Sequence, residues 1–227
     1  MPIDVGGNVI NSIGAKVLAG TGVVTSGLTC YLDAAIPASY PGSGTTWYDL
    51  SGNGNHGTLT NGPTFSGLNG GVIVLDGTND YVQVNLDYRT TDCTVIGAAR
   101  YISSSATERI FSGKDNNWLM GFWSSGIDRY YAEGWVTQGP GTKDTAWRIY
   151  ATKNKYSTDT WSLFGNGVLI AENANGSSGP YNFAIGGHLG QYEFSNAHVS
   201  AFLTYNRILT DAEILQNYNA LRGRIGI

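Results

Sequence analysis

The sequence predicts an all-β protein: a two-sheet antiparallel jelly-roll sandwich with one short C-terminal helix and an extended N-terminal arm. Composition is the first reason, because charged residues make up only 13% of the 227 residues, aromatic residues reach 12% and there are 32 glycines. Such a composition is typical of short strands joined by tight turns. The second reason is the succession of about a dozen short apolar segments, each bounded by turn residues.

Residues 47–82 show the pattern of strands and turns most clearly. Glycine alternates with asparagine and histidine over residues 52–57, and glycine and asparagine both tolerate left-handed backbone, so no helix is expected there. The run from Val72 to Leu75 predicts a short strand that ends at Asp76-Gly77. A first strand is predicted at residues 28–32.

The later strands are predicted from period-two alternation of side chains. Val82, Val84 and Leu86 share one face of a strand, and residues 94–102 alternate in the same way. The triplet 165–167, Gly-Asn-Gly, predicts a tight hairpin turn. Further strands are predicted at residues 109–112, 117–123, 129–135, 146–152, 161–164, 168–171, 183–186 and 198–206.

One helix is predicted near the C-terminus. Thr210 and Glu213 have the spacing of a capping box, in which each side chain accepts a hydrogen bond from the other residue's backbone N–H. Ile214 and Leu221 then fall on one helical face, and Gly223 is a candidate C-terminal cap. We expect this helix to pack on the sandwich in a structural role.

Residues 1–27 differ from the domain that follows, which we place at residues 28–227. They hold six glycines, no aromatic residue, and only Asp4 and Lys16 as charged residues. One interpretation is a flexible terminus. The interpretation we prefer is an arm that anchors the domain to a neighbouring subunit or scaffold by strand addition.

Charge and hydropathy exclude several functions. The net charge of -4 and the scattered basic residues do not suggest nucleic-acid binding, and no stretch reaches the ~18 apolar residues of a membrane span. The N-terminus has no charged region before an apolar core, so we expect no secretory signal. Cys30 and Cys93 are expected to be two buried thiols, and the alternative is a disulfide between them.

Motifs near both ends of the domain carry a family resemblance. They are LDA (32–34), YPGSGTTWYDLSGNGNHGTLTNGPTF (40–65), LDGTNDYV (75–82) and AFLTYNRILTDAEILQNYNALRGR (201–224). Over about residues 28–224 the chain resembles the laminin-G-like, concanavalin-A-like lectin and glucanase jelly-roll domain. The motif variant resembles that of tailed-bacteriophage structural proteins, such as capsid decoration and tail-fibre proteins. The resemblance implies two antiparallel sheets that bind ligands through loops or a concave face.

The sequence contains no recognisable catalytic set. The glucanase branch of this family uses a Glu-x-Asp-x-Glu strand, which is absent here, and the glutamates are isolated from one another. The three histidines are far apart in the sequence and show no zinc spacing. We therefore expect the protein not to be an enzyme and to require no cofactor.

The family resemblance also implies a structural calcium ion as a candidate. Asp49, Asp76 and Asp80 match the family's motif positions, and carboxylates are ligands that calcium prefers. The alternative is that these residues only form Asx turns.

Five aromatic residues in the middle of the chain are candidates for carbohydrate binding: Trp118, Trp123, Tyr130, Tyr131 and Trp135. The adjacent tyrosines must face opposite sides of a strand, so at least one is expected to face outward. The alternative for each residue is a place in the core.

The leading functional hypothesis is a non-enzymatic virion protein of a tailed phage, with a capsid decoration or cement protein ranked first. The arm would bind a capsid or tail protein, the jelly roll would be displayed and could bind a host-surface glycan, and the chain would form a homotrimer. It would be assembled in the bacterial host cytoplasm and carried on the phage particle. Neither nucleic-acid binding nor membrane insertion is expected. The alternatives are a tail-fibre or spike component and a carbohydrate-binding lectin.

Overall fold

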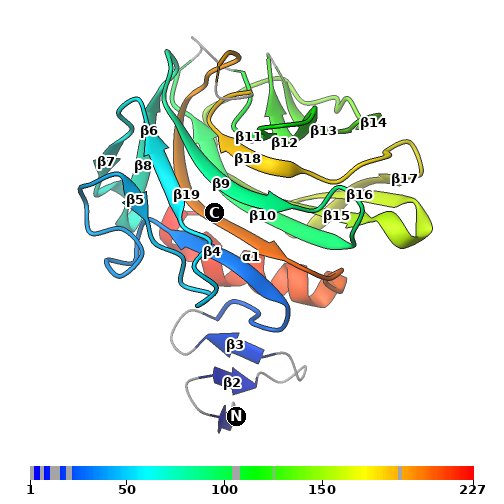
Figure 1. Ribbon diagram of the computed structural model, residues 1–227, viewed down its shortest axis with the longest axis horizontal. Helices are drawn as coiled ribbons and strands as arrows, with labels where there is room; N and C mark the ends of the chain where they lie inside the picture. The colour runs from blue at the N-terminus through cyan, green and yellow to red at the C-terminus, as the bar shows by residue number, and fades with distance from the viewer. Residues whose placement is uncertain are drawn as a thin grey trace.

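In the computed structural model, two antiparallel β-sheets pack face to face and a single α-helix lies beside one of them (Figure 1). The structure describes residues 22–103, 108–124, 126–188 and 191–227, together with the backbone of three short strands before them. The predicted all-β sandwich with one C-terminal helix is confirmed. Within these ranges, no helix has the length and apolar character that a bilayer crossing requires.

The back sheet contains the strands that lie next to the helix. Its order is β17-β16-β15-β10-β19-β8-β7, with β4 also paired to β19. The bounds are β4 Leu28–Asp33, β7 Thr64–Ser66, β8 Val72–Asp76, β10 Cys93–Tyr101, β15 Arg148–Lys155, β16 Thr160–Gly165, β17 Val168–Asn173 and β19 Asn196–Tyr205. The turn between β16 and β17 holds Asn166 at φ 50° and Gly167 at φ 82°, which confirms the predicted hairpin.

The front sheet forms the other layer. Its order is β14-β13-β12-β11-β18-β9-β6-β5, so strands distant in the sequence become neighbours. The bounds are β5 Thr46–Trp47, β6 Gly57–Thr60, β9 Tyr81–Asp87, β11 Phe111–Gly113, β12 Trp118–Trp123, β13 Gly126–Ala132, β14 Trp135–Thr137 and β18 Tyr181–Ile185. Two short 3-10 turns occur at Leu68–Gly70 and Tyr156–Thr158.

The main core lies between the two sheets and is rich in large aromatic side chains. Phe111 and Phe202 come from opposite sheets and stack with ring centroids 6.1 Å apart. Residue 97 must be glycine, because a Cβ there would lie 2.3 Å from the Phe111 ring. Cys30 and Cys93 are unpaired thiols in this core, as expected, and burial raises the pKa of both.

A second core covers the outer face of the back sheet. Helix α1 (Asp211–Ile225) buries Ile214, Leu221 and Ile225 against apolar residues of β4, β10, β15 and β19. The predicted capping box of Thr210 and Glu213 is present. The predicted end of the helix is wrong, because the chain stays helical through residue 223 and the left-handed cap is Gly226, at φ 77°.

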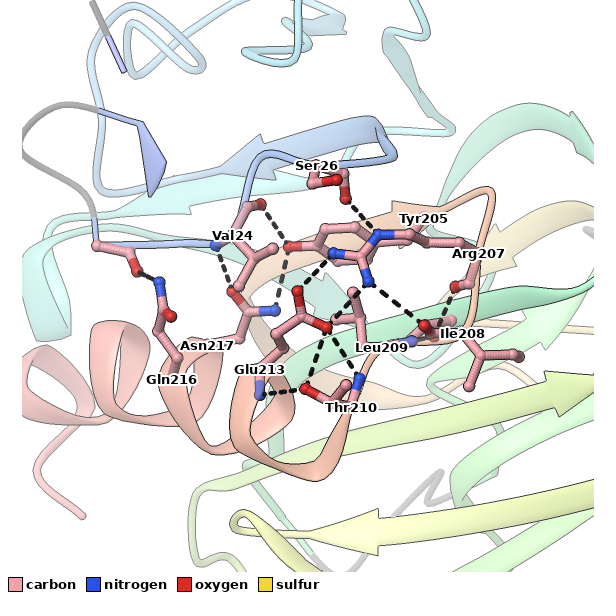
Figure 2. A network of polar contacts seen from close by, with 12 residues as sticks. Val24, Ser26, Tyr205, Arg207, Ile208, Leu209, Thr210, Glu213, Gln216 and Asn217 are labelled. Atoms are coloured by element: carbon pink, nitrogen blue, oxygen red, sulfur yellow. Dashed lines mark hydrogen bonds and ion pairs between the residues drawn. The ribbon is translucent and has the colours of Figure 1, made fainter. Parts of the chain in front are cut away.

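The segment before β4 is joined to the helix by a polar network (Figure 2). The Val24 N–H donates to Asn217 Oδ1 at 2.9 Å, and the Tyr205 hydroxyl donates to the Val24 carbonyl at 3.0 Å. Arg207 Nε donates to the Ser26 carbonyl, and its guanidinium pairs with Glu213 at 2.6 Å. These contacts tie the two ends of the domain together.

This network corrects the domain boundary that we placed after residue 27. Val23 and Val24 are fully buried in the second core, so residues 22–27 belong to the packed domain. Before them, β1 (Ile3–Val5), β2 (Asn8–Ile10) and β3 (Lys16–Leu18) pair with one another in a three-stranded sheet. The prediction that the arm anchors the domain depends on side chains and segments outside the described residues, so it stays a prediction.

Candidate functional site

The outer face of the front sheet is the face that the two cores leave uncovered. The buried front-sheet residues that belong to a core all lie in the core between the two sheets. The helix covers only the back sheet. Alternation along β12 turns Trp118 and Met120 inward and Leu119 and Trp123 outward. Strands β12, β13 and β14 lie together at one end of the molecule (Figure 1), so their outward side chains share one surface.

A pocket of about 230 Å³ lies on this surface. It is lined by Arg109, Asn117, Leu119, Trp123, Tyr131 and Trp135. The rings of Trp123 and Trp135 have centroids 5.3 Å apart and planes tilted by 43°. Tyr131 meets Trp135 edge-on, at 5.1 Å and 67°. All three aromatic side chains are half-buried, so each shows part of its ring to solvent.

The polar end of the pocket is built around Arg109, which is only 5% exposed. Its Nη1 donates to Asn117 Oδ1 at 2.7 Å and lies 3.2 Å from His188 Nδ1, while its Nε forms an ion pair with Glu193. Burial, and then the Arg109 charge, lower the pKa of His188. His188 is therefore neutral at pH 7, as a ring beside a buried guanidinium must be to avoid repulsion.

Further charged groups lie next to the residues that line the pocket. The Asn117 N–H donates to Glu133 Oε1 at 2.7 Å, and the Arg129 guanidinium lies 5.7 Å from the centre of the Trp123 ring. Burial, and then the nearby Glu193, raise the pKa of Glu108. The site thus combines aromatic faces with fixed hydrogen-bonding groups, which is the usual make-up of a small-ligand pocket.

The structure divides the five predicted aromatic residues into two groups. Trp123, Tyr131 and Trp135 line the pocket, whereas Trp118 and Tyr130 are fully buried between the sheets. Trp118 Nε1 and the Tyr130 hydroxyl both donate to Asn154 Oδ1, at 3.1 and 2.6 Å. The prediction that these two residues are available to a ligand is wrong, because strand alternation turns them toward the core.

Sequence reasoning did not identify Arg109, Asn117, His188 or Glu193 as site residues. Asn117 could have been found, because it shares the outward parity of Leu119 on a predicted strand. Arg109, His188 and Glu193 carry no such signal. They meet only because β11 lies between β12 and β18 in the sheet.

The first calcium candidate, Asp49, accepts hydrogen bonds from its own turn and from β4. Its Oδ1 accepts from the N–H groups of Tyr31 and Ser51, each at 2.8 Å, and its Oδ2 accepts from Asn55 N–H at 3.0 Å. These bonds hold the loop of residues 49–55 against β4, which is the Asx-turn role.

Asp76 and Asp80 make a second turn. Asp76 Oδ1 accepts from Thr78 N–H at 2.7 Å, and such bonds lower the pKa of Asp76. Asp80 Oδ2 accepts from Asp76 N–H at 3.2 Å, while burial and the Asp76 charge raise its pKa. No three His, Cys, Asp or Glu side chains in the described ranges could hold a metal ion together. The three predicted ligands therefore do not fit one shared calcium site.

A second pocket of about 180 Å³ lies near the loop between β4 and β5. Its lining is Ala34, Ala35, Pro37, Tyr40, Pro41, Gly42, Phe65 and Gly70. The Tyr40 hydroxyl already donates to the Gly44 carbonyl at 2.8 Å. Because no charged side chain lines this pocket, it offers little polar recognition.

No model of a known protein family matches the sequence, and no curated protein matches it either. Solved structures match the fold. The binding domain of Paraclostridial Mosquitocidal Protein 1 has a TM-score of 0.64 at 15% identity, over 87% of this chain and 53% of that one. This chain thus spans about half the length of that toxin domain.

Two other solved structures are also similar to this chain. Domain 4 of AbnA, a GH43 extracellular arabinanase from Geobacillus stearothermophilus in complex with arabinotriose, has a TM-score of 0.64 at 16% identity and covers 84% of this chain and 98% of that one. Trypanosoma rangeli sialidase has a TM-score of 0.61 at 14% identity and covers 88% and 34%. At these identities the likeness establishes the fold, a β-sandwich shared with all three proteins.

Proposed function

We propose that this domain binds carbohydrate in the aromatic pocket of the front sheet. The observation that carries the proposal is the pocket in which Trp123, Tyr131 and Trp135 lie beside the fixed polar groups of Arg109 and Asn117. Aromatic faces pack against the C–H faces of a sugar ring, while amide and guanidinium groups bond its hydroxyls. The pocket therefore offers both kinds of contact that a sugar requires.

The comparisons support this proposal without deciding the ligand. Domain 4 of the arabinanase was solved with arabinotriose, so a sandwich of this fold can carry a sugar. We propose binding without catalysis, because Glu193 and Glu133, two carboxylates next to the lining residues, already have partners. Glu193 pairs with Arg109, and Glu133 accepts the Asn117 N–H. The lectin alternative of the sequence analysis thus becomes the leading proposal.

Replacing Trp135 with alanine is expected to weaken glycan binding at least about tenfold, because Trp135 contacts both other rings of the pocket. Binding to a glycan array, followed by titration of the strongest glycan, measures the effect. Tyr48→Ala is the matched control: Tyr48 is 45% exposed and follows β5, at the opposite edge of the same sheet. Equal losses in the two variants, or no loss in either, would exclude this pocket as the site.

Display on a phage particle is a separate proposal that rests on the sequence. Its support is the motif variant at residues 40–65 and the apolar, glycine-rich segment that precedes the domain. In this proposal a capsid or tail protein binds the N-terminal segment of a homotrimer, and the glycan pocket faces the host. Mass spectrometry of purified phage particles is expected to detect the chain in stoichiometric amounts, and its absence from the particles would rule the proposal out.

A further inference from the structure

We infer that the pocket of the front sheet takes one uncharged sugar unit at the end of a glycan chain. This inference rests on the proposed function and specifies the class of glycan. Two features carry it: the mutual tilt of the three aromatic rings, and the ion pair that neutralises the buried arginine at the end of the pocket.

The rings pack against one another at an angle and line the pocket, so they do not form a flat surface. The Trp135 plane is tilted by 43° to Trp123 and by 67° to Tyr131. Rings tilted this strongly do not form the flat surface on which successive units of a straight, ribbon-like chain stack. The pocket volume of about 230 Å³ is also below the ~300–1,000 Å³ of pockets that enclose drug-sized ligands. A single sugar unit is therefore the ligand that this shape favours, with the rest of a chain leading out to solvent.

At the buried end of the pocket the Arg109–Glu193 ion pair disfavours an acidic sugar, and the Arg129 guanidinium beside Trp123 is not part of the lining. Arg109 is the buried cation, and its Nε contacts Glu193 Oε2 in an ion pair although the angle is not that of a hydrogen bond. A carboxylated sugar would have to compete with Glu193 for this guanidinium and would bring two like charges together. An uncharged sugar meets no such repulsion and can bond the groups already fixed there.

The hydrogen-bonding groups of the lining suit hydroxyl groups. Asn117 is held at both its backbone N–H and its side-chain oxygen, by Glu133 and Arg109, so its position is fixed. Trp123 Nε1 has no hydrogen-bond partner in the described part of the chain, but it is shielded from solvent. The fixed amide of Asn117 is therefore the group of the lining that meets a sugar hydroxyl.

The test is a glycan array on which each neutral hexose, pentose and N-acetylhexosamine is printed in three forms. In the first form the neutral sugar is the terminal unit of the chain. In the second it lies inside a longer chain, and in the third a sialic or uronic acid is attached to it as the terminal unit. We expect the full-length protein to bind the terminal neutral form at least about tenfold more tightly than the other two. Equal or tighter binding to internal or acid-capped forms would overturn this inference and leave the proposed function standing. Binding to no glycan, or binding that Trp135→Ala does not reduce, would overturn both.

A second variant tests the charge argument by itself. Glu193→Gln removes the counter-charge of Arg109, so the discrimination against acid-capped glycans is expected to fall at least about tenfold. Glu172→Gln is the matched control, because Glu172 is exposed on β17 of the back sheet, where its carboxylate accepts a hydrogen bond from the Ser162 hydroxyl. Unchanged discrimination in folded Glu193→Gln protein would contradict the role of the ion pair.

Discussion

Replacing Trp118 with alanine is expected to lower the free energy of unfolding by about 3–5 kcal/mol. Trp118 is fully buried, and it contacts Tyr130 and Phe183 edge-on at centroid distances of 6.1 and 5.8 Å. Its removal leaves a cavity between the sheets and takes one of two donors from Asn154 Oδ1. The free energy of unfolding of a single domain is only about 5–15 kcal/mol, so this one substitution removes a large part of it.

Urea denaturation followed by circular dichroism measures this loss. Trp118→Phe, which refills most of the cavity, is expected to lose less than Trp118→Ala. Trp135→Ala should lower the unfolding free energy by less than about 1.5 kcal/mol, because Trp135 is half-buried on the outer face. Protein that stays folded with alanine at 118 should keep its glycan affinity. A larger stability loss at 135 than at 118 would contradict the assignment of faces.

These two tryptophans show where sequence reasoning stops. Alternation correctly places Val82 and Val84 in the core, because a polar residue stands between them. Strand β12 reads WLMGFW and has apolar or aromatic residues at both parities. Its pattern therefore predicts a strand but not which of its faces is inside. Only the opposite sheet decides, since Asn154 on β15 supplies the acceptor for Trp118.

Local motifs were predicted well where their chemistry is local. The capping box of Thr210 and Glu213 and the turn at Asn166-Gly167 are each complete within a few residues. The polar end of the pocket is different, because Arg109 and Glu193 are far apart in the sequence and meet through sheet order. The boundary at residue 27 failed for the same reason: the partner of Val24 is Asn217, on the helix at the other end of the chain.

Replacing Arg224 with methionine is expected to lower the free energy of unfolding by about 3 kcal/mol. Arg224 Nη1 lies 2.7 Å from Asp33 Oδ2, and the Asp33 side chain is fully buried. Without the guanidinium, the donors left to that carboxylate among the described residues are the Tyr31 hydroxyl and the Ala35 N–H. Removing one partner of a buried pair costs roughly 3–5 kcal/mol, and the partial exposure of Arg224, 22%, places this case at the low end.

Chemical denaturation measures the loss, and hydrogen exchange shows where it acts. Because Arg224 lies in the last turn of α1, the amides of that turn and of Val24 should exchange faster in the variant. Arg222→Met is the matched control: Arg222 is exposed two residues earlier and should change stability by less than about 0.5 kcal/mol.

Asp33→Asn combined with Arg224→Met should be less destabilised than the sum of the single variants, because the two side chains interact directly. Strict additivity, or equal losses at 222 and 224, would show that the pair does not hold the helix to β4.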